Sequence, residues 1–73
     1  MPRPRIPAYK QVAADLRRRI ESGELHRGES IPSIVNLADE YHVATGTIQK
    51  ALALLKREGL IESEPGYGTF ISS

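Results

Sequence analysis

A short series of small, polar and basic side chains recurs at the spacing of one helix face. The series runs from residue 45 to residue 53 and contains no acidic residue. Glutamine can pair with adenine, threonine and alanine can contact the thymine methyl group, and lysine binds phosphate. This face therefore predicts contact with the major groove of DNA. Its members are Thr45, Gly46, Gln49, Lys50 and Ala53.

The opposite face of the same segment is apolar at positions i, i+3, i+4 and i+7, which is helical spacing. Gly59 follows the last apolar residue and is expected to end the helix in a left-handed conformation. The pattern predicts a helix over about residues 45–58 with one buried and one free face. The apolar positions are Ile48, Ala51, Leu52 and Leu55.

A shorter helix and a tight turn are expected just before this helix. Leu37, Ala38 and Tyr41 give the shorter helix an apolar face, and its turn is plugged by a valine, Val43. Ser33 is a good N-cap, because its hydroxyl can accept from backbone N–H groups of the first turn. Two short helices joined in this way form a helix-turn-helix, whose second helix enters the major groove of DNA.

The predicted start of the second of these helices is weak. Ala44 cannot cap a helix with its side chain, and Gly46 lowers the local helix propensity. Each feature costs on the order of 0.5–1 kcal/mol. A functional gain should offset this cost. Without a side chain at Gly46, a phosphate or a base edge can approach the N-terminus of the helix closely.

The periodicity changes after Gly59. Residues 60–64 and 69–72 are expected to form two strands, and residues 65–68 have the composition of a turn. A hairpin beside a helix-turn-helix is a wing. Gly66 lets the backbone lie close to a surface, and the Tyr67 hydroxyl can donate to a phosphate. The alternative is a plain hairpin turn without a partner.

The N-terminal part begins with an extended segment and continues as a helix. Residues 1–7 contain three prolines with Arg3 and Arg5 between them, which predicts a flexible basic arm. This arm is either a solubilising terminus or a contact to phosphates or the minor groove. A helix is expected over residues 8–22, with Lys10 as a phosphate contact in its first turn. The arginines at 17–19 are expected to form a solvated face.

Residues 23–31 are expected to connect this helix to the helix-turn-helix. Leu25 should tuck into the core, Gly28 marks a turn, and residues 29–31 can add one short strand. The predicted fold class is mainly α with a small β-hairpin. It is a winged helix-turn-helix of three helices plus a wing sheet of two or three strands, spanning residues 8–73 after the arm of residues 1–7.

Length and composition restrict the function classes. A chain of 73 residues has room for one small domain, which buries only about 60% of its unfolded surface. The absence of cysteine excludes disulfides, cysteine-ligated zinc and thiol catalysis. His26 and His42 have no partner at metal-ligand spacing, and no glycine-rich phosphate loop follows a strand. We therefore expect no enzyme, no catalytic residue, no metal, no cofactor and no small-molecule effector site.

The apolar runs and the charges also bear on location and partners. No apolar run is long enough for a membrane helix or a signal peptide, so we expect a cytoplasmic protein without a membrane partner. The net charge of +1 is low for a nucleic-acid binder. Basic residues gather in the first quarter of the chain, whereas Glu58, Glu62 and Glu64 come late.

The order of these elements, with their residues, resembles the N-terminal DNA-binding domain of the GntR family of bacterial transcription regulators. The resemblance covers residues 6–71 and rests on an ordered set of short pieces. It implies a winged helix-turn-helix that binds operator DNA and regulates transcription, usually as a dimer on a palindromic site. The pieces are residues 7–12, 22–25 with Gly28, 31–33 with Leu37 and Ala38, Val43, Thr47, 51–55, 58–61 and 66–71.

The chain departs from the family pattern at its reading surface. The family usually has arginine, commonly in contact with DNA, at the positions of Val35, Thr45 and Gln49. Its turn glycine is His42 here, which predicts a left-handed non-glycine residue, and its capping serine is Ala44. Arginine paired with guanine is the commonest specific base contact. We therefore expect a DNA site that depends less on guanine, or weaker binding, with Gln49 able to read adenine.

The leading hypothesis is a sequence-specific transcription regulator, a repressor, whose partner is double-stranded operator DNA. The helix of about residues 45–58 would lie in the major groove and the wing of residues 65–68 near the minor groove. Phosphate contacts position such a protein, and base contacts specify the sequence. Phosphate contacts are expected from Lys10, Ser33, Thr47, Lys50 and Tyr67, and base contacts from Thr45, Gly46 and Gln49, with Gly66 and Tyr67 near the minor groove.

Two alternatives remain open. The missing arginines and the low net charge favour a winged-helix protein-interaction module without its own operator specificity, and salt dependence would distinguish it from a DNA binder.

Family members normally carry a C-terminal effector and dimerisation domain. This chain is expected to be either a part of such a protein or a minimal protein. Leu54 either packs under the wing or forms an apolar contact in a homodimer.

Overall fold

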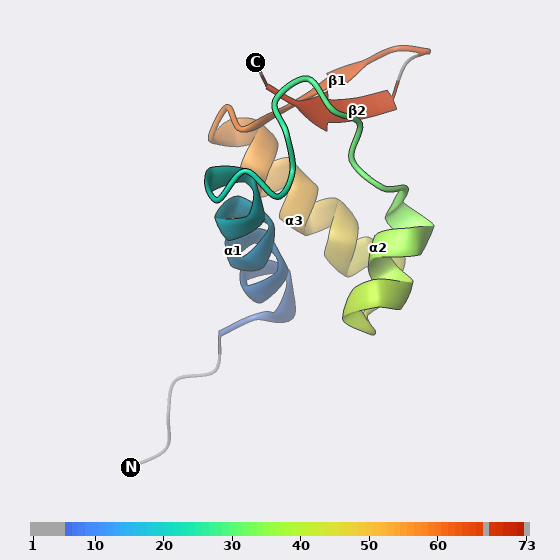
Figure 1. The fold of residues 1–73 in the computed structure, drawn as a ribbon. Helices are drawn as coiled ribbons and strands as arrows, with labels where there is room; N and C mark the ends of the chain where they lie inside the picture. Colours follow the sequence, from blue (N-terminus) through green and yellow to red (C-terminus); the bar gives the residue numbers. More distant parts are fainter. Residues whose placement is uncertain (1–5, 67, 73) are drawn as a thin grey trace.

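A computed structural model describes residues 6–66 and 68–72 of the chain (Figure 1). The elements follow in the order α1 (Ala8–Glu21), α2 (Ile34–Tyr41), α3 (Thr45–Arg57), β1 (Ile61–Glu64) and β2 (Gly68–Ile71). Helix α3 runs between α1 and α2, and the hairpin lies across the end where α1 and α3 finish (Figure 1). The expected winged helix-turn-helix is confirmed. Residues 1–5 of the expected N-terminal arm lie outside the described residues.

The helix ends follow the local chemistry of the sequence. The Ser33 hydroxyl accepts from the backbone N–H of Asn36 at 3.1 Å and so caps α2. His42 has a φ of 57° and ends α2 in the left-handed region, as the missing turn glycine predicts. Gly59 has a φ of 80° just after α3. Helix α1 ends at Glu21, one residue before the expected limit.

The core lies where the three helices and the hairpin meet. Leu16, Leu37, Ile48, Leu55, Ile61 and Ile71 are the largest fully buried side chains. The apolar stripes predicted for the helices face this core, and Leu25 joins it. Leu52 is only half-buried, because it lies at the edge of α3 beside the hollow that the hairpin borders. Burial of one face of α3 leaves the other face free.

The wing sheet has two strands plus one bridging residue. Ile61 pairs with Ile71 and Glu64 with Gly68 in an antiparallel register. Ser30 forms an isolated antiparallel bridge to Phe70, flanked by Ile31 N–H donating to Thr69 O at 3.0 Å. The short strand expected at residues 29–31 is therefore a single bridge. It ties the connector to the hairpin.

The arginine run of α1 is not the solvated face that the sequence suggested. Arg17 donates two hydrogen bonds to the Glu58 carboxylate, at 2.9 and 2.7 Å, across to the end of α3. Arg19 pairs with Glu24 and also donates to the Tyr41 hydroxyl of α2 at 3.0 Å. Only Arg18, which pairs with Asp15 on its own helix, is largely exposed. The expectation was wrong for Arg17 and Arg19 because their partners come from other elements.

The Tyr41 hydroxyl is the centre of a polar network between α1 and α2. It donates to the Asp15 carboxylate at 2.5 Å while it accepts from Arg19. This hydrogen bond holds the pKa of Asp15 below its ordinary value. Burial, and then the bond to Asp15, raises the pKa of Tyr41 to about 12. The network fixes the orientation of α2 against α1.

Candidate nucleic-acid interface

Helix α3 presents the predicted contact face to solvent. Thr45, Gly46, Gln49, Lys50 and Ala53 are all exposed, whereas Thr47 is half-buried. On the opposite side, Ile48, Ala51 and Leu55 are fully buried. The exposed face is therefore held in a fixed orientation by the core. It carries no acidic side chain, so phosphates can approach it without repulsion.

The N-terminus of α3 is open. Among the described residues no side chain caps it, and the hydrogen bonds that close its first turn run from the Thr47 N–H to Ala44 O at 3.0 Å and, longer, from the Ile48 N–H to the same oxygen. A Cβ added at Gly46 would meet no protein atom within 4 Å, so packing does not require glycine there. Uncapped N–H groups and a missing side chain make this helix end accessible to an anion or a base edge.

Lys50 is positioned by an aromatic ring from α1. Its ammonium lies 6.0 Å from the centroid of the Tyr9 ring, at the outer limit of a cation–π contact. Lys50 lines a shallow groove between α1 and α3 with Tyr9, Leu54 and Arg57. Leu54 therefore lies beside α1. Lys10, another expected phosphate contact, is exposed in the first turn of α1.

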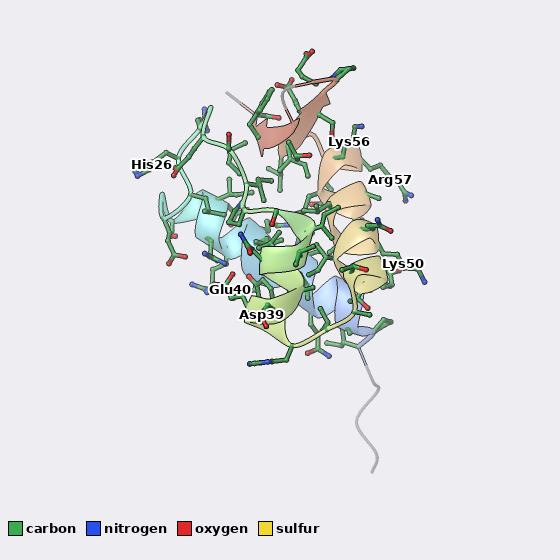
Figure 2. All side chains as sticks on the ribbon, turned by 90° about the vertical axis from the view of Figure 1, so that its right-hand side faces the viewer. His26, Asp39, Glu40, Lys50, Lys56 and Arg57 are labelled. Atoms are coloured by element: carbon green, nitrogen blue, oxygen red, sulfur yellow. The ribbon has the colours of Figure 1, made fainter. Side chains whose placement is uncertain are left out.

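Two further cations on α3 were missed by the sequence reasoning. Arg57 extends from the same side of α3 as Lys50, and Lys56 precedes it near the end of the helix (Figure 2). None of the three forms an ion pair with another residue in the described part of the chain. The spacing of seven residues between Lys50 and Arg57 was the available signal, because residues seven apart lie on one helix face.

Ser33 and the base of the wing come together. A hollow between the start of α2 and the hairpin is lined by Ser33, Leu52, Gly68 and Thr69, among others. Ser33 is exposed and uses its lone pairs for capping, so its hydroxyl proton remains able to donate to a phosphate. The structure thus brings one expected phosphate contact to the wing side of the molecule.

The backbone at the wing tip is left-handed at two glycines. Gly66 and Gly68 have φ values of 84° and 91°, a region that favours glycine. Gly66 is exposed, whereas Tyr67 lies outside the described residues. Glu62 and Glu64 are exposed on β1 and would repel phosphates. Any contact of the wing with DNA is therefore restricted to its tip.

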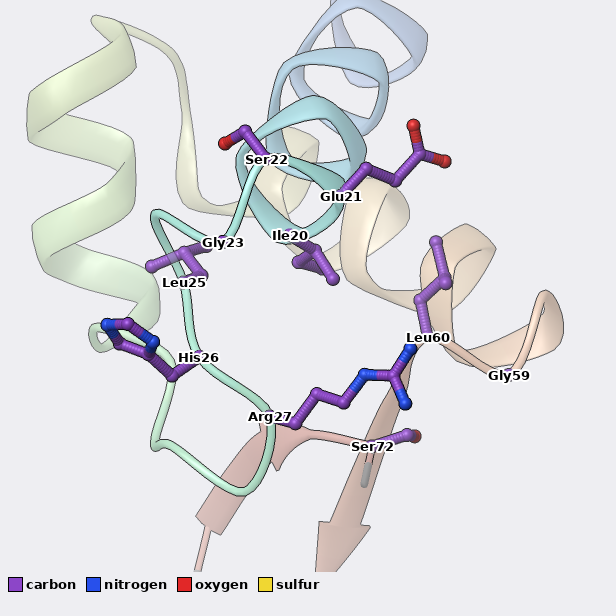
Figure 3. Close-up of a pocket in the computed structure, with 10 residues that line it drawn as sticks. All are labelled: Ile20, Glu21, Ser22, Gly23, Leu25, His26, Arg27, Gly59, Leu60 and Ser72. Atoms are coloured by element: carbon purple, nitrogen blue, oxygen red, sulfur yellow. The ribbon is translucent and has the colours of Figure 1, made fainter.

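A separate hollow lies at the other end of α3. It is lined by residues from the ends of α1 and α3, the connector and Ser72, and Arg27 extends across it toward Leu60 (Figure 3). Thr45 lies a full helix length away from this hollow, about 20 Å at 1.5 Å per residue. The hollow is therefore separate from the exposed first turns of α3.

The described residues offer neither a metal site nor a membrane span. Within residues 6–66 and 68–72, no group of three or more histidine, cysteine or acidic side chains is placed to hold a metal ion. In the same part of the chain, no helix combines the length and apolar character that crossing a bilayer requires.

Residues 8–71 match the family model described as bacterial regulatory proteins, gntR family. The chain belongs to the GntR family. The match covers α1, α2, α3 and both strands of the hairpin, so the family is shown by the whole fold rather than by one motif.

Curated GntR relatives share about a third of their residues with this chain. The HTH-type transcriptional repressor NagR of Bacillus subtilis is 36% identical over 67 residues, which is 92% of this chain and 28% of NagR. The repressor YtrA of the same organism is 35% identical over 71 residues, or 97% of this chain and 55% of YtrA. The chain thus spans between about a quarter and about half the length of these relatives.

Solved GntR structures have the same fold. AraR(DBD) in complex with operator ORR3 superimposes with a TM-score of 0.90 at 30% identity, covering 99% of this chain and 87% of the other. YtrA from Sulfolobus acidocaldarius, a GntR-family transcription factor, gives a TM-score of 0.87 at 34% identity, covering 96% of this chain and 73% of the other. These relatives confirm the predicted family and the winged helix-turn-helix fold.

Proposed function

We propose that this chain is the sequence-specific DNA-binding domain of a transcriptional repressor. The observation that carries the proposal is the exposed face of α3, which is free of acidic residues, open at its N-terminus and fixed by a buried opposite face. The proposal is supported by the fold shared with AraR(DBD), whose structure is in complex with operator ORR3. In this arrangement α3 enters the major groove, and residues 65–68 lie near the minor groove.

The contacts divide into those that position the domain and those that read the sequence. Lys10, Ser33 and Lys50 are exposed and can bind phosphates, and Thr47 can donate its hydroxyl to the same backbone. Base contacts come from the first turns of α3. They are Thr45, Gly46 and Gln49, with Gly66 and Tyr67 near the minor groove.

The other parts of the proposal concern the setting of the domain. We propose a domain over residues 8–73 that follows a basic, proline-rich arm over residues 1–7. A homodimer would bind the two halves of a palindromic site. The domain would act in the cytoplasm, catalyse no reaction and hold no small-molecule effector.

A titration against double-stranded DNA tests the DNA-binding proposal. The wild-type chain is titrated with random and A·T-rich duplexes at two salt concentrations, and amide NMR shifts map the contact surface. We expect affinity to fall steeply as salt rises. The largest shifts should fall on residues 45–50 and 66–68, while the hollow that contains Leu60 and Ser72 stays unperturbed. Absence of binding to any duplex at low salt by the folded chain would contradict the proposal.

A protein-interaction module is the second candidate. It is favoured by Val35, which is 68% exposed at the start of α2 and offers an apolar contact rather than a charge. Salt dependence separates the two functions. Binding to a protein through an apolar contact should persist at salt concentrations that release a phosphate-bound domain from DNA.

A further inference from the structure

Val35 does not stand alone on the surface. It lines a shallow hollow between α2 and the start of α3, together with Ala38, His42, Ala44 and Thr45. The hollow has no lysine or arginine in its lining. Scattered exposed apolar residues need no explanation, but an apolar hollow that continues into a proposed binding face does.

The hollow is continuous with the face proposed to read DNA. Thr45 both lines the hollow and begins the exposed face of α3. Val35, Ala44 and Thr45 offer methyl groups, while Asp39 contributes a carboxylate to the rim. That carboxylate would repel a phosphate, so the hollow suits a base edge rather than the DNA backbone. In the major groove, the base-edge group that matches methyl groups is the 5-methyl of thymine.

We propose that this hollow is a specificity site that receives the 5-methyl group of a thymine, with Val35 as the main contact. The proposal rests on the DNA-binding function proposed above and names the chemistry of one of its base contacts. It predicts discrimination of thymine from uracil, which differ only by that methyl group. Burial of one group of this size is worth about fourfold in affinity.

Asp39 supplies the competing chemistry. A carboxylate can accept a hydrogen bond from the N4 amino group of cytosine. With cytosine in the hollow, binding would depend on that amino group, whereas thymine offers only its methyl group to Val35.

The test crosses a protein change with a DNA change. A duplex is first selected from a random-sequence pool with the wild-type chain, and each thymine is then replaced singly by deoxyuridine. Dissociation constants are measured by fluorescence anisotropy at one salt concentration for the wild type, Val35→Ala and Ile6→Ala. Ile6 is the matched control, because at 59% exposed it is also a large exposed apolar side chain but does not line the hollow. Alanine favours a helix more than valine, so Val35→Ala should remain folded.

At one thymine, we expect deoxyuridine to weaken wild-type binding about fourfold. Val35→Ala should bind the two duplexes nearly equally, while Ile6→Ala keeps the wild-type ratio. The same duplexes are used for every protein, so any effect of uracil on the DNA itself cancels.

Two results would overturn the proposal. They are the absence of any uracil effect above twofold and an undiminished effect in Val35→Ala. In each case, salt-dependent binding of the duplex would leave the DNA-binding function standing. No binding to any duplex by the folded chain would overturn both.

Discussion

At the scale of single residues, the exposed face of α3 carries two kinds of polar group. Gln49 has an amide that can pair with adenine, and Lys50 next to it has a charge that can bind phosphate. Both are exposed on α3, and neither supports the core. Substitution of either residue should therefore change binding and leave the fold intact.

Gln49→Ala should weaken binding to a selected duplex by about 1–3 kcal/mol and leave binding to random DNA almost unchanged. Lys50→Ala is the matched control on the adjacent position. It should weaken both duplexes equally and reduce the slope of log affinity against log salt by about one. Anisotropy titrations over a salt series measure both effects. Equal losses on the two duplexes for Gln49→Ala would contradict its role as a base contact.

The uncapped start of α3 gives a second prediction at the scale of the residue. Ala44→Ser should add a side-chain cap and raise the free energy of unfolding by about 1 kcal/mol. Ser33→Ala removes the existing cap of α2 and should lower it by a similar amount. Urea unfolding measures both variants. If DNA binds the uncapped N–H groups of α3, the affinity of Ala44→Ser for duplex DNA should not rise along with its stability.

At the scale of elements, the helices are locked together by side chains distant in sequence. Tyr41 of α2 joins Asp15 and Arg19 of α1, and Arg17 reaches Glu58 at the end of α3. These contacts set the orientation of α2 and α3 relative to α1. Their loss should affect stability and its dependence on pH.

Tyr41→Phe should lower the free energy of unfolding by about 1 kcal/mol at pH 7, because one hydroxyl makes both hydrogen bonds. The pKa of Asp15 is lowered in the folded state, so its stabilisation is present above pH about 4 and lost as pH falls. The pKa of Tyr41 is raised to about 12, so its stabilisation is present below pH about 10 and lost as pH rises toward 12.

The wild type and Tyr41→Phe should therefore differ most near neutral pH and less at pH 3 or pH 11. Urea unfolding at these three pH values measures the difference. Tyr9→Phe is the control, since no hydrogen bond of the Tyr9 hydroxyl is found among the described residues. A constant difference at all pH values would show that Tyr41 acts through packing alone.

The same contrast explains what the sequence could predict. Helical spacing located the three helices and the buried stripe of α3, and turn chemistry located the hairpin, because these signals are local. The partners of Arg17 and Arg19 could not be predicted from local patterns in the sequence. Glu58 lies 41 residues from Arg17 in the chain, and Tyr41 lies 22 residues from Arg19. The cations at Lys56 and Arg57 could not be told from ordinary dipole-favourable charges in the last turn of a helix. The hollow at Val35 depends on how two helices meet.

At the scale of the whole molecule, a small core must hold the exposed face of α3 in a fixed orientation. Typical stabilities of about 0.05–0.15 kcal/mol per residue give about 4–11 kcal/mol for a chain of 73 residues. One large loss in the core would therefore remove much of the stability. Loss of an exposed side chain of similar size would not.

Two positions on α2 provide a matched test of this difference. Leu37 is 0% exposed beneath the helix, while Val35 is 68% exposed two residues earlier. Leu37→Ala should lower the free energy of unfolding by about 2–5 kcal/mol, since it leaves a cavity at the junction of α2 and α3. Val35→Ala should change it by less than about 0.5 kcal/mol. Chemical denaturation measures both, and duplex DNA should raise the apparent stability of each folded variant by an amount that grows with the logarithm of its affinity. Equal losses for the two variants would mean that α2 is held mainly by its polar network rather than by the core.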